Sequence, residues 1–383
     1  MLRSLFTAAL VAGVSAAGLY SPDAVDKLAQ DTLPKLKEWL AKNPQGNCTV
    51  ETAIRRREWS DLSEAERKAY TDAVLCLQSK PPLTSSIAPG AKSRFDDYVV
   101  VHIQQTPRNH GSTFFLPWHR YYIWHYENAL RTEFQATNMT VQYWNWDRYA
   151  KDPVNSPLFN GNEFSMGGNG AKVQHAGVQI PGAPRPYNVI PPGDGGGCVT
   201  TGPFRNMSVN IGPIAPSLTV TRNPRSDGFG YNPRCLRRDV NKNAAAVTTA
   251  NYTLDLITKN SNVYWFQTVM EGQFPQGKWG VHAGGHYTVS GDPAGDFYVS
   301  PGDPVFWLHH SMIDRVWWIW QMQDLVKRTA EVSMTKTMNN MPASANGTLD
   351  DPNNLGVLAG DVKTRDLMST VGGMGGKLCY IYE

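Results

Sequence analysis

Long apolar runs, charge and basic clusters are all scarce in this chain of 383 residues. Beyond the first twenty residues, no stretch approaches the roughly 20 apolar residues that a membrane-spanning helix needs, so no membrane partner is expected. Charged residues make up only 18% of the chain and the net charge is +3. The Lys and Arg residues form no basic stripe interleaved with aromatics, so nucleic acid is not an expected partner either.

Cysteine is also scarce, with five residues in all. In an oxidising compartment they can form at most two disulfides and leave one thiol. The first pairing expected is Cys198 with Cys235, because both lie in a loop-rich middle region that needs closing. Cys48 with Cys76 is the second expectation.

The first residues have the pattern of a secretory signal. An apolar stretch at Leu5–Val14 follows Arg3 and leads to the small residues of Ser15–Gly18. We therefore expect residues 1–17 to be a signal peptide and residues 18–383 to form a single secreted, extracellular domain. Asn-X-Ser/Thr sequons mark surface loops that carry N-glycans in a secreted protein, and they stand at Asn47, Asn138, Asn206, Asn251 and Asn346.

Apolar periodicity and capping signals predict a mainly helical chain with few short strands. One or two helices interrupted at Pro34 are expected in residues 21–43. The other predicted helices are 64–78 after a capping box at Ser63, 94–106 ending before Pro107, 118–134 beginning at Pro117, and 304–328. Helical patterns also extend over about 251–271. Residues 107–111 are predicted to be a turn. Residues 151–233 are rich in Gly and Pro and predict a packed, irregular cover pinned by a disulfide.

The histidines of this chain are unevenly distributed along the sequence. Of nine histidines, four lie within residues 102–127 and four within residues 282–320, and only His175 lies elsewhere. Neutral imidazole is a good ligand for copper, zinc, iron and nickel. Two histidine-rich stretches with few carboxylates therefore indicate a buried metal centre in a four-helix bundle.

Local spacing alone leaves alternatives open. His282 and His286 lie one helical turn apart and can reach one metal, although such a pair can also be an ordinary polar edge of a helix. The HAGGH sequence that contains them lacks the glutamate of the HExxH zinc-protease motif, which argues against a zinc hydrolase. His309 and His310 fall on adjacent rows of the next helix, and row geometry does not decide which of them is a ligand.

Two longer motifs carry a resemblance to a known family. HGSTFFLPWHR at residues 110–120, followed by Glu127, resembles the first copper signature of tyrosinases and catechol oxidases. DPVFWLHH at residues 303–310, followed by Asp314 and Arg315, resembles their second signature. The similarity extends over roughly residues 48–382.

The resemblance implies two copper ions in a type 3 centre that binds O2 as peroxide between them. It implies that copper A is held by His102, His110 and His119, and copper B by His282, His286 and His310. The family uses the second histidine of the His-His pair, so His309 becomes a neighbour, while His125 and His175 match no ligand position. Asp314 is the expected partner that fixes the tautomer of a ligand histidine.

Two departures from the family pattern matter. Many members have a cysteine two residues before the middle copper A ligand, which forms a thioether with a histidine, and Arg108 occupies that position here. No such crosslink is expected. Only Glu383 follows the Tyr-X-Tyr motif ending at Tyr382, which marks the end of the family's catalytic domain, so a shielding carboxy-terminal domain is not expected.

The expected function is oxidation of small phenols with O2. In tyrosinases, a Glu and an Asn directly after the first copper B histidine are thought to hold the water that deprotonates monophenols. Glu271 is a plausible counterpart of the Glu, but Ala283 stands at the Asn position, and Tyr287 is bulkier than the residue often found after the second histidine. We therefore expect a catechol oxidase that is weak on monophenols. A full tyrosinase and, less favoured, a haemocyanin-like oxygen carrier are the alternatives.

Overall fold

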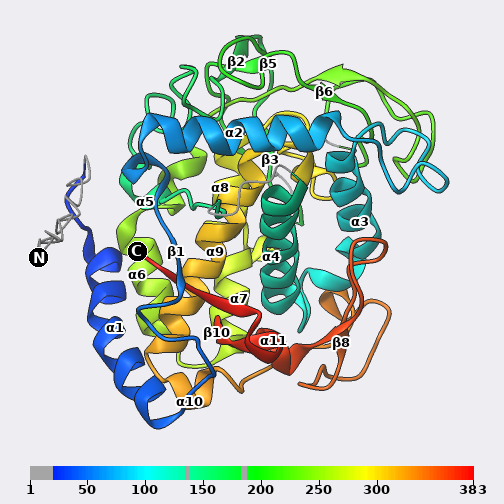
Figure 1. The fold of residues 1–383 in the computed structure, drawn as a ribbon. Helices are drawn as coiled ribbons and strands as arrows, with labels where there is room; N and C mark the ends of the chain where they lie inside the picture. The colour runs from blue at the N-terminus through cyan, green and yellow to red at the C-terminus, as the bar shows by residue number, and fades with distance from the viewer. Residues whose placement is uncertain (1–19, 134–138, 183–187, 217) are drawn as a thin grey trace, which may run out of the picture.

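The structure is a computed structural model that describes residues 20–133, 139–182, 188–216 and 218–383. It is mainly helical, with long irregular segments and short strands (Figure 1). The α-helices are α1 Ala24–Lys42, α2 Glu64–Ser79, α3 Arg94–Asn109, α4 Phe115–Glu133, α5 Trp146–Tyr149, α6 Ala250–Lys259, α7 Val263–Glu271, α8 Val281–Val289, α9 Val305–Met322, α10 Leu325–Arg328 and α11 Gly373–Gly376. The strands are β1 Ile54–Arg56, β2 Gly170–Lys172, β3 Val178–Gln179, β4 Val189–Ile190, β5 Gly196–Val199, β6 Ser208–Val209, β7 Arg234–Cys235, β8 Pro352–Asn353, β9 Val362–Lys363, β10 Val371–Gly372 and β11 Leu378–Tyr382.

A bundle of α3, α4, α8 and α9 forms the centre of the molecule, which confirms the predicted fold class. Helix α9 is buried along its whole length, from Val305 to Met322. A helix that is apolar on nearly every side must be surrounded by other elements. Helices α4, α8, α6 and α1 pack against α9, and α2 crosses one end of α3 and α4 (Figure 1).

At three prolines the helices begin, continue or end differently from the sequence predictions. Pro34 is exposed in the middle of α1, which continues through it as one helix because its buried face, including Leu36 and Leu40, packs against α6 and α9. Pro107 lies inside the last turn of α3, so the predicted turn at 107–111 begins three residues later. Helix α4 begins two residues before Pro117, since none of the first four N–H groups of a helix has a partner within it.

The other predicted helices are present, although not all of them end where predicted. The capping box at Ser63 is present and starts α2. Pro304, and not the predicted Asp303, directly precedes α9, although Asp303 accepts the Val305 N–H at 2.9 Å. That helix ends at Met322, and the last residues of the predicted range form the separate helix α10.

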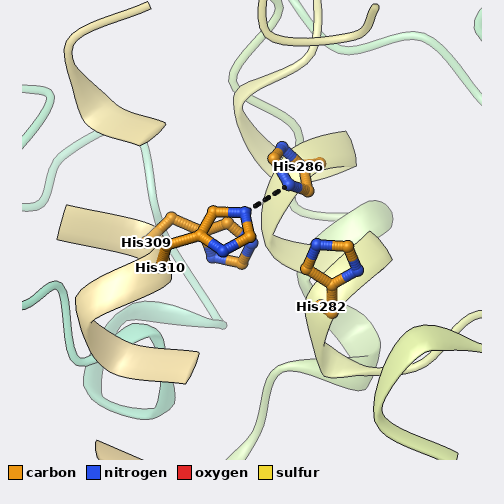
Figure 2. A group of neighbouring side chains, drawn as sticks. All are labelled: His282, His286, His309 and His310. Carbon is orange, nitrogen blue, oxygen red and sulfur yellow. Dashed lines mark hydrogen bonds between the residues drawn. The ribbon is translucent and has the colours of Figure 1, made fainter. Parts of the chain in front are cut away.

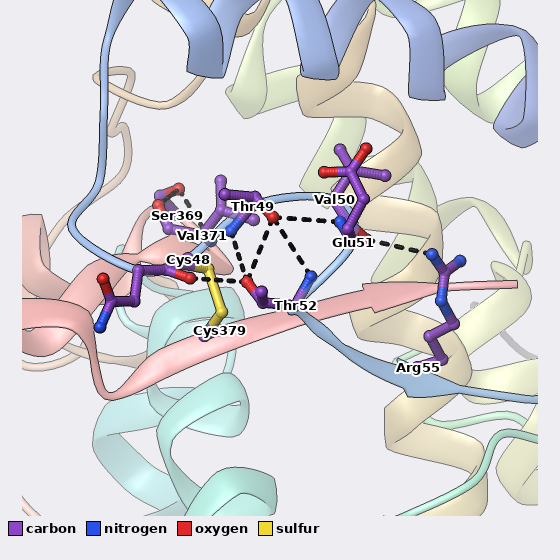
Figure 3. Close-up of a disulfide and its surroundings, with 10 residues drawn as sticks. Cys48, Thr49, Val50, Glu51, Thr52, Arg55, Ser369, Val371 and Cys379 are labelled. Carbon is purple, nitrogen blue, oxygen red and sulfur yellow. Dashed lines mark hydrogen bonds between the residues drawn. A yellow bond between two sulfur atoms is a disulfide. The ribbon is translucent and has the colours of Figure 1, made fainter. Parts of the chain in front are cut away.

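One of the two expected disulfides is present and the other is not. Cys198 and Cys235 are bonded, which confirms the first pairing. Cys48 pairs with Cys379 and not with Cys76, which is a free thiol on α2 (Figure 3). The reason is that β1 and β11 pair in parallel, which brings the segment before β1 beside the carboxy-terminal strand.

The described parts of residues 151–233 form an irregular cover with short strand pairs, as predicted. Strand β2 pairs with β5 and β6 with β7, and the Cys198–Cys235 bond joins β5 to β7. Just after this bond, the buried Arg238 guanidinium donates two hydrogen bonds of 2.7 and 2.8 Å to the carboxylate of Asp303 at the start of α9. The end of the cover is therefore fixed to the helix that carries His309 and His310.

The described sequons are at the surface. Asn47, Asn206, Asn251 and Asn346 are all exposed. Asn138 and the expected signal peptide lie outside the described residues. No helix in the described part of the chain is long and apolar enough to cross a membrane.

Candidate metal centre

Three histidines converge at one end of α3 and α4. His102 lies on α3, His110 is the residue that ends α3, and His119 lies in the second turn of α4. One nitrogen from each lies within 4.8 Å of one nitrogen from each of the others. All three imidazoles are buried. The sequence predictions for this group therefore come together at a single point.

The outer nitrogen of each of these rings faces a backbone carbonyl. Nδ1 of His102 lies 2.8 Å from the Tyr298 carbonyl oxygen, and Nδ1 of His119 lies 2.7 Å from the Phe115 carbonyl oxygen. Nδ1 of His110 lies 3.3 Å from a carbonyl one turn earlier in α3. A carbonyl can only accept, so Nδ1 carries the proton and Nε2 presents its lone pair. The Nε2 atoms of His102 and His119 are buried and have no hydrogen-bond partner among the described residues.

A second histidine group joins α8 and α9. His282 and His286 project from one face of α8 toward His310 of α9 (Figure 2). The Nε2 atoms of His286 and His310 are 3.1 Å apart, and Nε2 of His282 is buried with no partner. His309 also lies within the 4.8 Å limit of this group. The structure thus brings together the three predicted ligands of this group, and His309 lies beside them.

The two groups are adjacent. The rings of His119 and His310 stack at 4.4 Å with an angle of 14° between their planes. The rings of His110 and His282 are 6.2 Å apart. Six imidazoles therefore surround one buried space at the centre of the bundle.

Burial keeps these histidines neutral. It lowers the pKa of His102 to about 4 and that of His286 to about 3. Burial, together with the neighbouring imidazoles, also lowers the pKa of His110, His119 and His310 well below the ordinary value. Neutral imidazole is the form that binds a metal, and neither cluster contains a carboxylate. The unpartnered Nε2 atoms therefore fit two metal ions with imidazole ligands, of which copper is one.

His309 occupies a niche behind the second group. Its ring lies 5.1 Å from that of Trp146 and 4.5 Å from that of His286. A Cβ atom on Gly285 would stand 2.2 Å from the His309 ring, so the glycine allows α8 to approach α9 at this point. The ring of His310, and not that of His309, stacks on His119 of the first group.

A cavity of about 90 Å³ opens beside the two groups. It is lined by His110, His282, His286, Glu271, Ala283, Tyr287, Phe274, Ala294, Gly295, Phe297 and Ser300. The three residues predicted to influence substrate choice, Glu271, Ala283 and Tyr287, all line it. They are therefore next to the candidate metal ligands.

Glu271 is partly buried at the end of α7. Its Oε2 accepts the Gly111 N–H at 2.9 Å, and its Oε1 accepts the Gln267 amide at 2.8 Å. Burial raises the pKa of Glu271 to about 7, although both hydrogen bonds oppose the shift. A carboxyl group with such a pKa can exchange a proton near neutral pH.

Phe297 is a cavity residue that the sequence analysis missed. Its ring lies 4.5 Å from that of His110, while 42% of its surface remains exposed. It stands in an irregular loop with no periodic pattern, so no sequence signal distinguished it from other surface aromatics. An exposed aromatic side chain above a buried ligand marks the mouth of the cavity.

The predicted role of Asp314 is wrong. Its carboxylate accepts from Arg120 Nε at 2.7 Å and from the hydroxyl groups of Tyr380 and Tyr382 at 2.7 and 2.6 Å. Although burial opposes ionisation, the Arg120 guanidinium holds the pKa of Asp314 below its usual value. Both oxygens of Asp314 are occupied by these partners and by Arg56, and none of its hydrogen bonds in the described part of the chain goes to His310. It ties β11 to the bundle.

The two remaining histidines lie outside both groups. Nδ1 of His125 lies 3.0 Å from the Tyr98 hydroxyl. His175 lies in the cover with Nε2 3.1 Å from a carboxylate oxygen of Asp239. Neither belongs to the candidate centre.

Comparison with known proteins places this geometry in a family. Residues 92–323 match the common central domain of tyrosinase. Tyrosinase P of Aspergillus terreus is 37% identical over 241 residues, which are 62% of this chain and 67% of the relative. N-acetyl-6-hydroxytryptophan oxidase of Emericella nidulans is 36% identical over 352 residues, which are 88% of this chain and 94% of the relative.

A solved structure is similar over nearly the whole length. A mutant form of the polyphenol oxidase of Thermothelomyces thermophila has a TM-score of 0.87 and 42% identity, covering 96% of this chain and 99% of that one. The chain belongs to the tyrosinase family, whose members are type 3 dicopper oxidoreductases. The expected family is thereby confirmed.

Proposed function

We propose that this protein is a copper-dependent polyphenol oxidase that converts ortho-diphenols to ortho-quinones with O2. His102, His110 and His119 hold copper A in this proposal, and His282, His286 and His310 hold copper B. The observation that carries it is the convergence of six neutral imidazoles, five of them buried and that of His286 partly exposed, on the centre of the bundle. Copper bound there supplies the redox chemistry, so that two diphenols and one O2 give two quinones and two waters.

The chain contributes the binding site for the phenol. The cavity is small and borders His110, His282 and His286, so a ring that enters it must lie against the ligands. The Phe297 ring lies beside that of His110, and Tyr287 and Phe274, which both pack against one small apolar cluster, also line the cavity. These apolar walls exclude water and orient the two hydroxyl groups of the substrate toward the centre.

Ala283 favours a diphenol over a monophenol as substrate. Hydroxylation of a monophenol requires a base for its single phenolic proton, within hydrogen-bond reach directly or through one water. Glu271 is available, but the side chain of Ala283 offers no polar atom to hold a water between the base and the phenol. A diphenol is easier to oxidise, so it depends less on such a water.

A second candidate function, a tyrosinase with full monophenol hydroxylase activity, is favoured by one observation. Glu271 lines the cavity and has a pKa of about 7, which suits a general base at neutral pH. Relative rates on a monophenol and its matching diphenol distinguish the two functions. Comparable rates would make the enzyme a tyrosinase.

Single replacements of the proposed ligands test the metal assignment. His110→Ala and His310→Ala should each leave a folded protein with about half of the wild-type copper and almost no oxidase activity. His125→Ala is the matched control, since that histidine lies outside both groups, and it should keep its copper. Copper per chain, thermal unfolding and O2 consumption are measured together. Full activity in either ligand variant contradicts the assignment.

We also propose that the protein is secreted and glycosylated. The pattern of its first seventeen residues supports secretion, and the exposure of Asn47, Asn206, Asn251 and Asn346 supports glycosylation. Expression in a eukaryotic host should release protein that begins near Ala17 or Gly18 and loses mass with a glycosidase. Retention of the full amino terminus in the cell would contradict this.

A further inference from the structure

Asp296 is a buried carboxylate whose hydrogen bonds, within the described part of the chain, are all to backbone N–H groups. It has no exposed surface. Oδ2 accepts the N–H groups of Ile214 and Ala215 at 2.7 and 2.9 Å, and Oδ1 accepts those of Tyr298 and Val299 at 2.9 and 3.3 Å. One side chain thus joins the cover to the loop between α8 and α9.

The loop that Asp296 fixes contacts the candidate metal centre at two adjacent residues. The carbonyl oxygen of Tyr298, whose own N–H is bound by Asp296, lies 2.8 Å from Nδ1 of His102. Phe297 lies between Asp296 and Tyr298 in the chain. Its ring lies 4.5 Å from that of His110 and lines the cavity. The position of this short segment therefore affects both a ligand and the cavity mouth.

The cover side of the contact is equally well packed. Ile211 and Val299 are buried in one apolar cluster with Val99 and Val100 of α3, the helix that carries His102. A Cβ atom on Gly212 would stand 2.7 Å from a Val299 methyl group, so the cover meets the loop without space between them. The carboxylate lies between two segments that cannot shift independently.

We propose that Asp296 is a positioning residue for copper A and for substrate entry, and that it couples the cover to both. It holds the Tyr298 carbonyl where it orients His102, and it holds Phe297 over His110. The inference rests on the proposed function, because it requires His102 to be a metal ligand. No catalytic step is assigned to Asp296 itself.

Asparagine is the informative replacement because it keeps the size of the side chain and removes one acceptor. A carboxylate accepts on both oxygens, whereas an amide presents one oxygen and one NH2 group. In Asp296→Asn, one pair of backbone N–H groups must face the amide nitrogen without an acceptor. The side chain of residue 296 then loses its hydrogen bonds either to the loop or to the cover.

The test measures copper retention and steady-state kinetics of the loaded enzyme. After dialysis against a chelator, Asp296→Asn should keep about one copper per chain where wild type keeps two. Its KM for 4-tert-butylcatechol should rise about tenfold, the factor expected for loss of one buried hydrogen bond, while kcat changes less. Asp227→Asn is the control, because Asp227 also accepts a backbone N–H, from Phe229, but is exposed at the surface. Unchanged copper retention and KM in Asp296→Asn would overturn the inference.

If the variant does not fold, a measurement on the wild-type protein tests the coupling between the cover and copper A. Coupling is reciprocal, so copper loading should slow amide hydrogen exchange in residues 211–216 as well as in residues 296–300. Protection of 296–300 alone would overturn the coupling. If wild type binds no copper, or if His102→Ala retains both ions, the proposed ligand assignment fails. If those behave as expected and Asp296→Asn resembles wild type, only the inference about Asp296 fails.

Discussion

Replacing Ala283 with asparagine is the sharpest test of the proposed substrate preference. Ala283 is 5% exposed and lines the cavity together with Glu271. The two carboxylate oxygens of Glu271 each accept one hydrogen bond, from Gly111 and Gln267. A carboxylate has about four lone-pair positions, so Glu271 can accept a further hydrogen bond from water. An asparagine at position 283 adds the polar partner that such a water lacks.

The size of the effect follows from the hydrogen bonds that are gained. The cavity of about 90 Å³ can hold about three waters, each taking about 30 Å³ in the liquid. One hydrogen bond to a buried water that also contacts a charged group contributes about 1.5–3 kcal/mol. If this stabilises only the transition state for monophenol deprotonation, the ratio of monophenol to diphenol rates should rise by about 10- to 100-fold.

The assay compares tyramine with its catechol, dopamine, by initial O2 consumption at equal copper content. Ala283→Leu is the matched control, because leucine has the same branching and the same number of side-chain heavy atoms as asparagine but offers no hydrogen bond. It should slow both substrates by steric crowding without raising the ratio. An unchanged ratio in Ala283→Asn with intact diphenol oxidation would refute the reasoning. Equal rates on both substrates in the wild type would also refute it.

Two further predictions concern stability. Cys48→Ser opens a covalent loop of 331 residues and should lower the free energy of unfolding by about 2–5 kcal/mol in chemical denaturation, whereas Cys76→Ser should have little effect; equal effects would contradict the pairing. In copper-free protein, the raised pKa of Glu271, about 7, means that its contribution to stability is fully present below about pH 4.5 and is lost as the pH rises through 7. Between these two pH values the free energy of unfolding should fall by about 3 kcal/mol. Glu271→Gln should abolish that part of the pH dependence in equilibrium unfolding, and an identical pH profile would refute it.

Much of the fold was predictable because its signals are local. The capping box at Ser63 acts within one turn of helix, and its two partners are fixed by a three-residue spacing. The spacing of His282 and His286 places both rings on one face of α8 regardless of what packs against it. Local signals failed where packing outweighed them, as at Pro34 and Pro107, which both lie inside continuous helices.

The sequence by itself determined which histidines could gather, because eight of the nine lie in two short stretches and each stretch contains a motif that resembles a known copper signature. Only the tertiary structure decided what surrounds them. The Tyr298 carbonyl faces His102, Phe297 covers His110, and Asp314 binds Arg120 and β11 instead of a ligand. These contacts join segments up to 196 residues apart in the chain. No periodicity or short motif encodes such a distance, because it depends on how separate elements pack against one another.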